Sequence, residues 1–167
     1  MWISRVGLLG LMAWLSQAPA FAQDSAAKPG PPQWSIACAS PSVDTELRCR
    51  MTQELFAAEG RQRVLAVTVA RSATGGFEMT LAIPHGAMLP AGLLLKIDDR
   101  EPVKVAIESS NAAGVYARIP LDEALGAAVK RGNTMSVGIT NRSGKLVQIP
   151  VTLAGFTAGL TRLTALK

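Results

Sequence analysis

The sequence contains very few of the side chains from which metal sites and catalytic sites are usually built. Its 167 residues include one histidine, two cysteines and one tyrosine, and aromatic residues make up only 5% of the chain. A structural zinc site needs four ligands, most often cysteine and histidine, so the usual set is not available here. Hydrophobic residues still make up 49% of the chain and charged residues 17%. This is enough apolar material for a core, which must be built mainly from aliphatic side chains.

Motifs typical of common active sites are missing too. No G-x-S-x-G nucleophile motif occurs, and Gly75-Gly76 precedes a predicted strand rather than the helix that follows a phosphate-binding loop. The single histidine, His85, follows a predicted strand and has no nucleophile beside it in a recognisable motif. A catalytic triad requires three positioned groups. We therefore interpret His85 as an exposed loop residue and predict no enzyme, no cofactor and no metal. An envelope hydrolase that uses His85 with a partner brought close by folding stays the less favoured alternative.

The charge is basic but dispersed. The formal net charge is +5 at pH 7, which can indicate nucleic-acid or membrane partners. The densest basic groups are only the pairs Arg48/Arg50, Arg61/Arg63 and Lys130/Arg131. None is interleaved with stacking aromatic residues, so we expect no nucleic-acid partner. The acidic group of Asp98, Asp99 and Glu101 lacks the cadence of a calcium loop, and we interpret it as a hairpin turn.

The segment 1–22 has the features of a cleaved signal peptide. Arg5 precedes an apolar stretch from Val6 to Leu15, and Ala20-Phe21-Ala22 offers small residues at the two positions that a signal peptidase reads. The apolar stretch is too short to cross the roughly 30 Å hydrocarbon layer as a helix. We therefore predict a periplasmic, secreted or outer-surface protein with no transmembrane segment after cleavage. Residues 23–32, rich in Ala, Gly and Pro, are predicted to be a flexible leader before a domain at 33–167.

The two cysteines, Cys38 and Cys49, both lie in the predicted mature chain. An even number of cysteines in an exported protein favours a disulfide. Closing the short loop between them would remove roughly 2–3 kcal/mol of unfolded-state entropy. Two buried free thiols are the alternative interpretation.

Alternation of apolar and polar residues with a period of two runs through the chain from Trp34 onward. In the clearest case, Phe77, Met79, Leu81 and Ile83 are predicted to share one face of a strand. Similar rows are Leu47–Leu55, Leu65–Val69, Val103–Ile107, Val115–Ile119, Met135–Ile139 and Val147–Leu153. Turn residues such as Asn141-Arg142-Ser143-Gly144 separate the rows. Many short strands at regular spacing predict a mainly β domain, either an antiparallel sandwich or a barrel.

Two segments with helical spacing interrupt the strands. The first is a short helix at 122–131, with acidic residues at its start, basic residues at its end, and Gly132 as a C-terminal cap. The second is the C-terminal segment 156–166, in which Phe156, Leu160 and Leu163 fall on one face. We expect this second segment to dock on the domain.

Four segments carry a family resemblance. They are Trp34-Ser35-Ile36-Ala37-Cys38, then Cys49 with Gln53, then Pro84–Gly92 followed by Leu95–Asp98, and finally Leu153–Ala158. In this order they resemble the invasion-associated locus B family of bacterial exported proteins, over most of the mature chain. The resemblance implies an immunoglobulin-like β-sandwich in the periplasm or at the outer surface. It also implies a role linked in some members to host-cell invasion, and it carries over no catalytic residues.

One feature departs from the family pattern. Members commonly carry a second cysteine pair in the arrangement C-x-x-x-G-C, but here the corresponding positions are Ser110 and Val115, around Gly114. The second cross-link is therefore expected to be absent, which leaves the Cys38–Cys49 pair alone.

The absence of a catalytic motif in a rigid sandwich favours an interaction protein, which would bind an unknown protein partner in the envelope or on a host cell. Sandwiches present function on their loops. The candidate contact residues are Pro84, His85, Gly86, Leu89, Pro90, Asp98 and Asp99. The alternative is a structural or stress-related periplasmic protein without a specific ligand.

Overall fold

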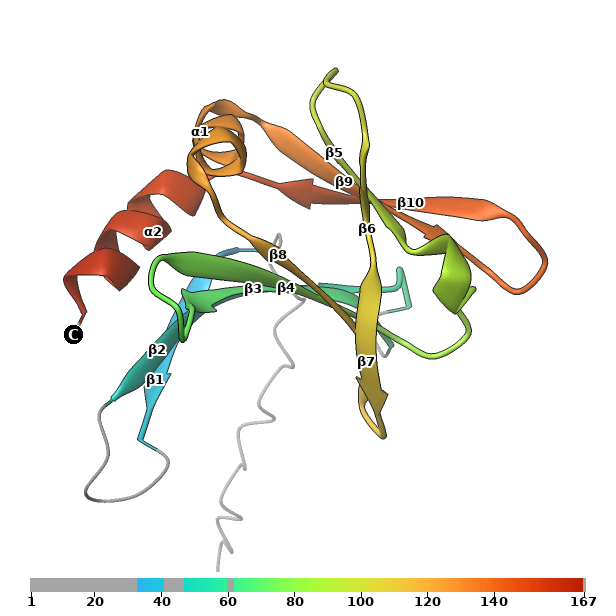
Figure 1. Cartoon of the computed structure of the whole chain (residues 1–167), viewed down its shortest axis with the longest axis horizontal. Coiled ribbons are helices and arrows are strands. Elements are labelled where there is room, and N and C mark those ends of the chain that lie inside the picture. Colours follow the sequence, from blue (N-terminus) through green and yellow to red (C-terminus); the bar gives the residue numbers. More distant parts are fainter. Residues whose placement is uncertain (1–32, 41–46, 60–61, 167) are drawn as a thin grey trace, which may run out of the picture.

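The computed structural model describes residues 33–40, 47–59 and 62–166, which form two antiparallel sheets with two short helices at one end (Figure 1). The predicted signal peptide, 1–22, and leader, 23–32, lie outside the described residues. The larger sheet has the strand order β1-β2-β3-β4-β8-β7, and the smaller has the order β10-β9-β5-β6. The strands of the larger sheet are β1 (Ser35–Ala39), β2 (Arg48–Phe56), β3 (Arg63–Arg71), β4 (Phe77–Ile83), β8 (Gly114–Pro120) and β7 (Ile107–Asn111). Those of the smaller sheet are β10 (Leu146–Thr152), β9 (Thr134–Thr140), β5 (Leu93–Ile97) and β6 (Val103–Val105).

The core lies between the sheets and is formed by the apolar side chains that alternate along each strand. On β4, Met79, Leu81 and Ile83 are buried, as the period of two predicts. The register places Leu81 opposite Val67 of β3 and Met79 opposite Val69, so the apolar rows of neighbouring strands are continuous. The fold is a mainly β antiparallel sandwich, so the alternative of a single barrel is wrong, and it is of the immunoglobulin-like kind that the family resemblance implies.

The predicted strand row Val103–Ile107 is wrong as a single element. The chain forms β6 in the smaller sheet, breaks at Ala106, and continues as β7 in the larger sheet. Alternation persists across the break because Val105 and Ile107 both face the interior on either side of a sheet-to-sheet crossing. A period of two indicates which side chains share one face of a strand, but it does not indicate which sheet the strand joins.

Both predicted helices are present. Helix α1 (Glu123–Arg131) begins after Asp122, whose carboxylate accepts a hydrogen bond from the Leu125 amide at 2.8 Å. It ends at Gly132, which is extended rather than left-handed; a Cβ there would lie 2.7 Å from the Ile97 side chain, and this close approach requires the glycine. Helix α2 (Phe156–Ala165) docks on the domain as expected, burying Phe156, Leu160 and Leu163.

Candidate interaction surface

The loop Pro84–Gly92 lies beside the β9–β10 hairpin, at the end of the smaller sheet away from the helices (Figure 1). The Met88 amide donates a hydrogen bond to the Thr140 carbonyl at 2.8 Å, and Ala87 forms an isolated bridge with Asn141. The loop also contains a short 3-10 helix, η1 (Leu89–Ala91), whose backbone is fixed by Pro90 in its first turn. Two segments far apart in the sequence therefore form one rigid end of the molecule.

Four large apolar side chains are exposed at this end: Met88 by 40%, Leu89 by 48%, and Leu146 and Val147 by 43% each. We call these four residues the apolar tip. Thr140 pairs with Leu146 on one side and accepts the Met88 hydrogen bond on the other. Met88 and Leu146 therefore lie about two strand spacings apart, or roughly 10 Å. Leu146 and Val147 are successive residues of β10 and lie on opposite faces of the hairpin, so the tip is apolar on both sides. Several exposed apolar side chains at one end of a molecule are typical of a binding surface, whereas isolated ones are ordinary.

The β9–β10 turn is held by a single side chain. The Asn141 Oδ1 atom accepts hydrogen bonds from the Ser143 amide at 3.0 Å, the Ser143 hydroxyl at 2.7 Å and the Lys145 amide at 2.9 Å. This confirms the turn predicted at Asn141–Gly144. Arg142 and Lys145 are exposed on this rigid turn, directly beside the apolar tip.

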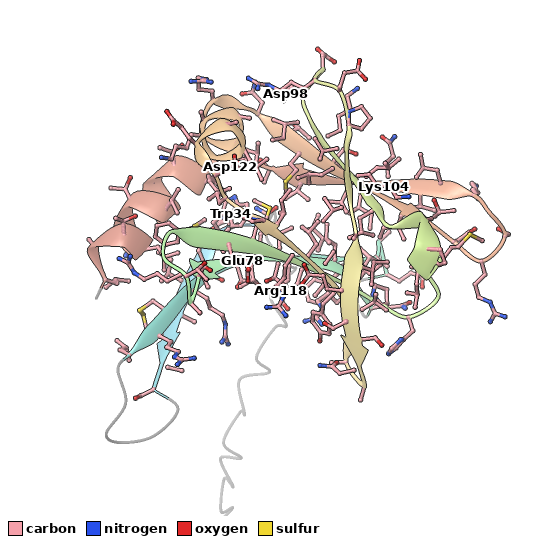
Figure 2. The ribbon with its side chains drawn as sticks, in the orientation of Figure 1. Trp34, Glu78, Asp98, Lys104, Arg118 and Asp122 are labelled. Atoms are coloured by element: carbon pink, nitrogen blue, oxygen red, sulfur yellow. A yellow bond between two sulfur atoms is a disulfide. The ribbon has the colours of Figure 1, made fainter. Side chains whose placement is uncertain are left out.

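The two predicted contact loops are not brought together. Pro84–Gly92 precedes β5 and the Asp98–Asp99 turn follows it, so they lie at opposite ends of a five-residue strand, roughly 16 Å apart. Figure 2 shows Asp98 at the far end of the β5–β6 hairpin. Pro84 is half-buried, whereas His85, Gly86, Leu89, Pro90, Asp98 and Asp99 are all exposed.

Asp98 has a structural role that could not be predicted from its neighbours in the sequence. Its carboxylate accepts hydrogen bonds from the Thr134 amide at 2.9 Å and from the Asn133 amide at 3.1 Å, which ties the β5–β6 turn to the start of β9. Its backbone is left-handed, with φ of 47°, a conformation that Asp tolerates better than most residues. The Asp98 carboxylate is therefore engaged within the protein.

His85 is an exposed loop residue, as interpreted from the sequence. No side chain in the described part of the chain forms a hydrogen bond with it, and the same residues contain no group of three His, Cys, Asp or Glu side chains that could hold a metal ion. Among the described residues, His85 therefore lacks the hydrogen-bonded partner that orients the histidine of a triad.

Two surface clefts lie elsewhere, near the helices. The smaller, about 470 Å³, lies between α1 and α2, and the larger, about 810 Å³, lies between the β2–β3 end of the larger sheet and α2. The larger cleft contains Arg71, whose guanidinium donates a hydrogen bond to the Thr164 carbonyl at 2.9 Å and lies 5.3 Å from the centre of the Phe77 ring. Arg71 thereby holds the last turn of α2 against the sheet.

Cys38 and Cys49 form the predicted disulfide, and the alternative of two free thiols is wrong. They are direct partners in the β1–β2 ladder, with Cα atoms 4.0 Å apart. Ser110 and Val115, at the positions of the family's second pair, are also direct partners, in the β7–β8 ladder. The β7–β8 register would therefore accept the second cross-link that the family resemblance implies.

Comparison with known proteins places these features in one family. The family model described as invasion associated locus B (IalB) protein matches residues 34–164. Two invasion protein B homologs, from Brucella abortus strain 2308 and from Brucella abortus biovar 1 strain 9-941, are each 33% identical over 134 residues, covering 80% of this chain and 76% of theirs. This chain belongs to the invasion-associated locus B family.

The fold agrees with a solved structure from the same family. The crystal structure of invasion associated protein B from Bartonella henselae superposes with a TM-score of 0.70 at 23% identity, covering 82% of this chain and 97% of the other. Proteins of the IalB family are exported, and the Cys38–Cys49 disulfide is in keeping with an oxidising compartment. Within the described residues, no helix has the length and apolar character that a membrane crossing requires. The family is named for invasion and is not a known enzyme family.

The sequence predicts only part of the apolar tip. Leu89 and Pro90 are predicted contact residues and Met88 lies in the same loop, but Leu146 and Val147 are not predicted. One signal was available: Leu146-Val147 places two apolar residues in succession directly after a turn, which breaks the period of two.

Proposed function

We propose that this chain is an exported interaction protein of the cell envelope, acting in the periplasm or at the outer surface after removal of residues 1–22. It binds a component of the envelope or of a host cell through the apolar tip, and it does not catalyse a reaction. The observation that carries this proposal is the exposure of four large apolar side chains at one rigid end of the sandwich. The names of its relatives, which are invasion proteins, support the same class of role.

The arrangement of the tip favours binding over accidental exposure. Of the remaining large apolar side chains that are exposed in the described residues, Leu47 and Leu166 line the larger cleft near α2, and Phe56 and Val103 lie on separate strands. At the tip, by contrast, the Met88–Thr140 hydrogen bond and the Asn141 turn fix both segments that carry the apolar residues. A preorganised apolar surface loses little conformational entropy on binding, which increases affinity.

The experiment is co-sedimentation of the mature chain, residues 23–167, with isolated envelopes of the producing bacterium and with intact host cells. The test variant is Leu89→Ser/Leu146→Ser, which removes half of the apolar tip. The control is Leu47→Ser/Phe56→Ser, which changes two residues of similar exposure, 49% and 50%, one just before β2 and one at its end.

We expect the unchanged protein and the control to bind equally to at least one of the two surfaces, and the tip variant to bind at least tenfold less. Circular dichroism verifies that both variants retain the β-sandwich. If all three proteins bind equally, or if none binds either surface, the proposed function is wrong.

A further inference from the structure

Acidic and basic side chains are distributed unequally between the two sheets. The strands of the smaller sheet contain Lys96 and Lys104 but no Asp or Glu. All ion pairs among the described residues lie on the larger sheet: Arg63–Glu54 at 2.9 Å, Arg118–Glu108 at 3.2 Å and Arg118–Glu78 at 3.8 Å. Figure 2 shows Glu78 and Arg118 together on the larger sheet and Lys104 apart from them, on β6. Lys96 and Lys104 therefore form no ion pair among the described residues, and no acidic residue lies on their sheet, whereas the unpaired Arg48, Arg50 and Arg71 of the larger sheet share it with three glutamates.

The same imbalance extends to the apolar tip. Arg142 and Lys145 are exposed and form no ion pair within the described part of the chain. Neither the loop 84–92 nor the segment 140–148 contains an acidic residue. The charged residues of the segments that carry the tip are thus all cationic.

At Gly138, the absence of a side chain lets the apolar tip continue onto the outer face of the smaller sheet. A Cβ at Gly138 would lie 3.1 Å from the Leu94 Cβ and 3.2 Å from the Leu146 Cδ1. Leu146 therefore lies across the glycine beside Leu94, and Lys104 is the register partner of Leu94 on the next strand. The result is an apolar strip that runs from the sheet face to the tip with lysine at its border.

The apolar tip and the adjoining strip of the smaller sheet form a projecting surface and not a cleft. None of its residues lines either of the clefts found near the helices. Apolar side chains on a projecting loop, bordered by Lys and Arg, are suited to a partner that has a negatively charged surface layer and an apolar layer beneath it. An anionic bilayer has this structure, because its headgroups carry the charge and its acyl chains begin just beneath them.

We propose that the apolar tip and the outer face of the smaller sheet bind peripherally to an anionic lipid bilayer. This inference rests on the proposed function, since it names the partner of the same tip. Met88, Leu89 and Leu146 enter the headgroup region, and Arg142 and Lys145 contact the lipid phosphates. The acidic turn at Asp98–Glu101 lies at the opposite end of β5. Repulsion there orients the sheet so that the tip enters first.

The experiment uses the mature chain with its disulfide intact and two kinds of vesicle. One is made of phosphatidylglycerol and phosphatidylethanolamine, and the other of phosphatidylcholine alone. We expect at least tenfold tighter binding to the anionic vesicles, with a loss of affinity as salt screens the headgroup charge. No preference for the anionic vesicles would overturn the inference.

Matched variants separate the tip from the overall charge. Arg142→Gln/Lys145→Gln removes two charges beside the tip, and we expect a loss of about 25-fold, since each cation near an anionic surface contributes about fivefold. Arg48→Gln/Arg50→Gln removes the same charge from β2 on the larger sheet, where both residues are exposed, and should change binding less than about twofold by this argument. Equal losses for the two pairs would show that only net charge matters, and the inference would be wrong.

A protease treatment of the envelopes distinguishes this inference from the proposed function. Binding that depends on the tip and persists on protease-treated envelopes supports the lipid. Binding that depends on the tip but disappears after protease treatment, with no binding to anionic vesicles, overturns the lipid inference and leaves the interaction function standing with a protein partner. Envelope binding that does not depend on the tip overturns both.

Discussion

The Trp34 indole and the Gln53 side-chain amide donate hydrogen bonds to the same acceptor, the Thr152 carbonyl, at 3.1 Å and 3.2 Å. Trp34 precedes β1, Gln53 lies in β2, and Thr152 ends β10, so this junction joins the edge of the larger sheet to the edge of the smaller one. Trp34 also packs edge-on against Phe156 of α2, with ring centres 5.1 Å apart. The Thr152 carbonyl thus accepts two hydrogen bonds, and both of them link the two sheets at the same side of the sandwich.

Gln53 is the one buried polar residue among those described, and its Oε1 atom has no hydrogen-bond partner there. We predict that Gln53→Met changes the free energy of unfolding by less than about 1 kcal/mol. The lost hydrogen bond to Thr152 contributes about 1 kcal/mol, whereas the buried acceptor without a partner costs about 1–3 kcal/mol, and the substitution removes both. Urea unfolding measures the difference, and a loss above about 3 kcal/mol would show that Oε1 is satisfied in solution.

Gln53→Glu is predicted to make stability depend on pH. Burial disfavours the charged form of the introduced carboxyl, so its pKa in the folded state is raised above the unfolded value of about 4.3. The unfolded state releases the proton first, and the free energy of unfolding therefore falls as pH rises above about 4.3, by up to about 1.4 kcal/mol per unit until the folded-state pKa is reached. Urea titrations from mildly acidic to neutral pH measure this slope, with Gln53→Met as the control.

Gly126 and Gly159 lie in different helices and should respond oppositely to alanine. A Cβ at Gly159 would overlap the sulfur of Met51, which is fully buried and has no room to move, so Gly159→Ala is predicted to destabilise by roughly 1–3 kcal/mol. At Gly126 the nearest atom, Leu121 Cγ, lies at an ordinary 3.8 Å, and Gly126→Ala should stabilise α1 by up to about 1 kcal/mol. Thermal unfolding compares the two, and shifts of the same sign would contradict the prediction.

The register of β7 and β8 predicts that the missing cross-link can be restored. Ser110 and Val115 are direct ladder partners, as Cys38 and Cys49 are, so Ser110→Cys/Val115→Cys should form a disulfide under oxidising conditions. The added bond should stabilise by about 2 kcal/mol, because it closes a short loop. Thiol counting by mass spectrometry tests this. The control Ser109→Cys/Val115→Cys places the thiols out of register and should keep both free.

Removing the Asp98 carboxylate is predicted to destabilise the protein. Asp98→Ala removes the acceptor for the Asn133 and Thr134 amides and places alanine at a positive φ, so we expect a loss of about 1–2 kcal/mol. Asp98→Asn should lose less, because asparagine keeps one carbonyl acceptor and tolerates the left-handed region. Asp99→Ala, on the same turn and with no hydrogen bond from its side chain in the described residues, should change stability by less than about 0.5 kcal/mol by the same reasoning. Equal losses at Asp98 and Asp99 would contradict the assigned role.

The sequence alone determined the features that depend on neighbouring residues. Alternation predicts the buried row of β4, the charges and Asp122 predict α1, and the Asn141–Gly144 signal predicts the β9–β10 turn. These features follow local rules of spacing, capping and turn chemistry, so they can be recognised in a short stretch of sequence. The sequence also leaves Cys49 as the only possible partner of Cys38 within the chain, whereas the β1–β2 register places the two close enough to bond.

Tertiary structure alone decided which distant segments meet. The hydrogen bond of Met88 to Thr140 and the approach of Leu94 to Leu146 across Gly138 depend on the pairing of β5 with β9, which are not neighbours in sequence. The crossing at Ala106 depends on which sheet each half of the chain joins. The sequence contains Leu146 and Arg142, but its periodicity does not show that they lie near Met88 in the folded protein. The cationic border of the apolar tip emerges only in the tertiary structure, because the loop 84–92 must pack beside the β9–β10 hairpin before Arg142 and Lys145 lie near Met88 and Leu89.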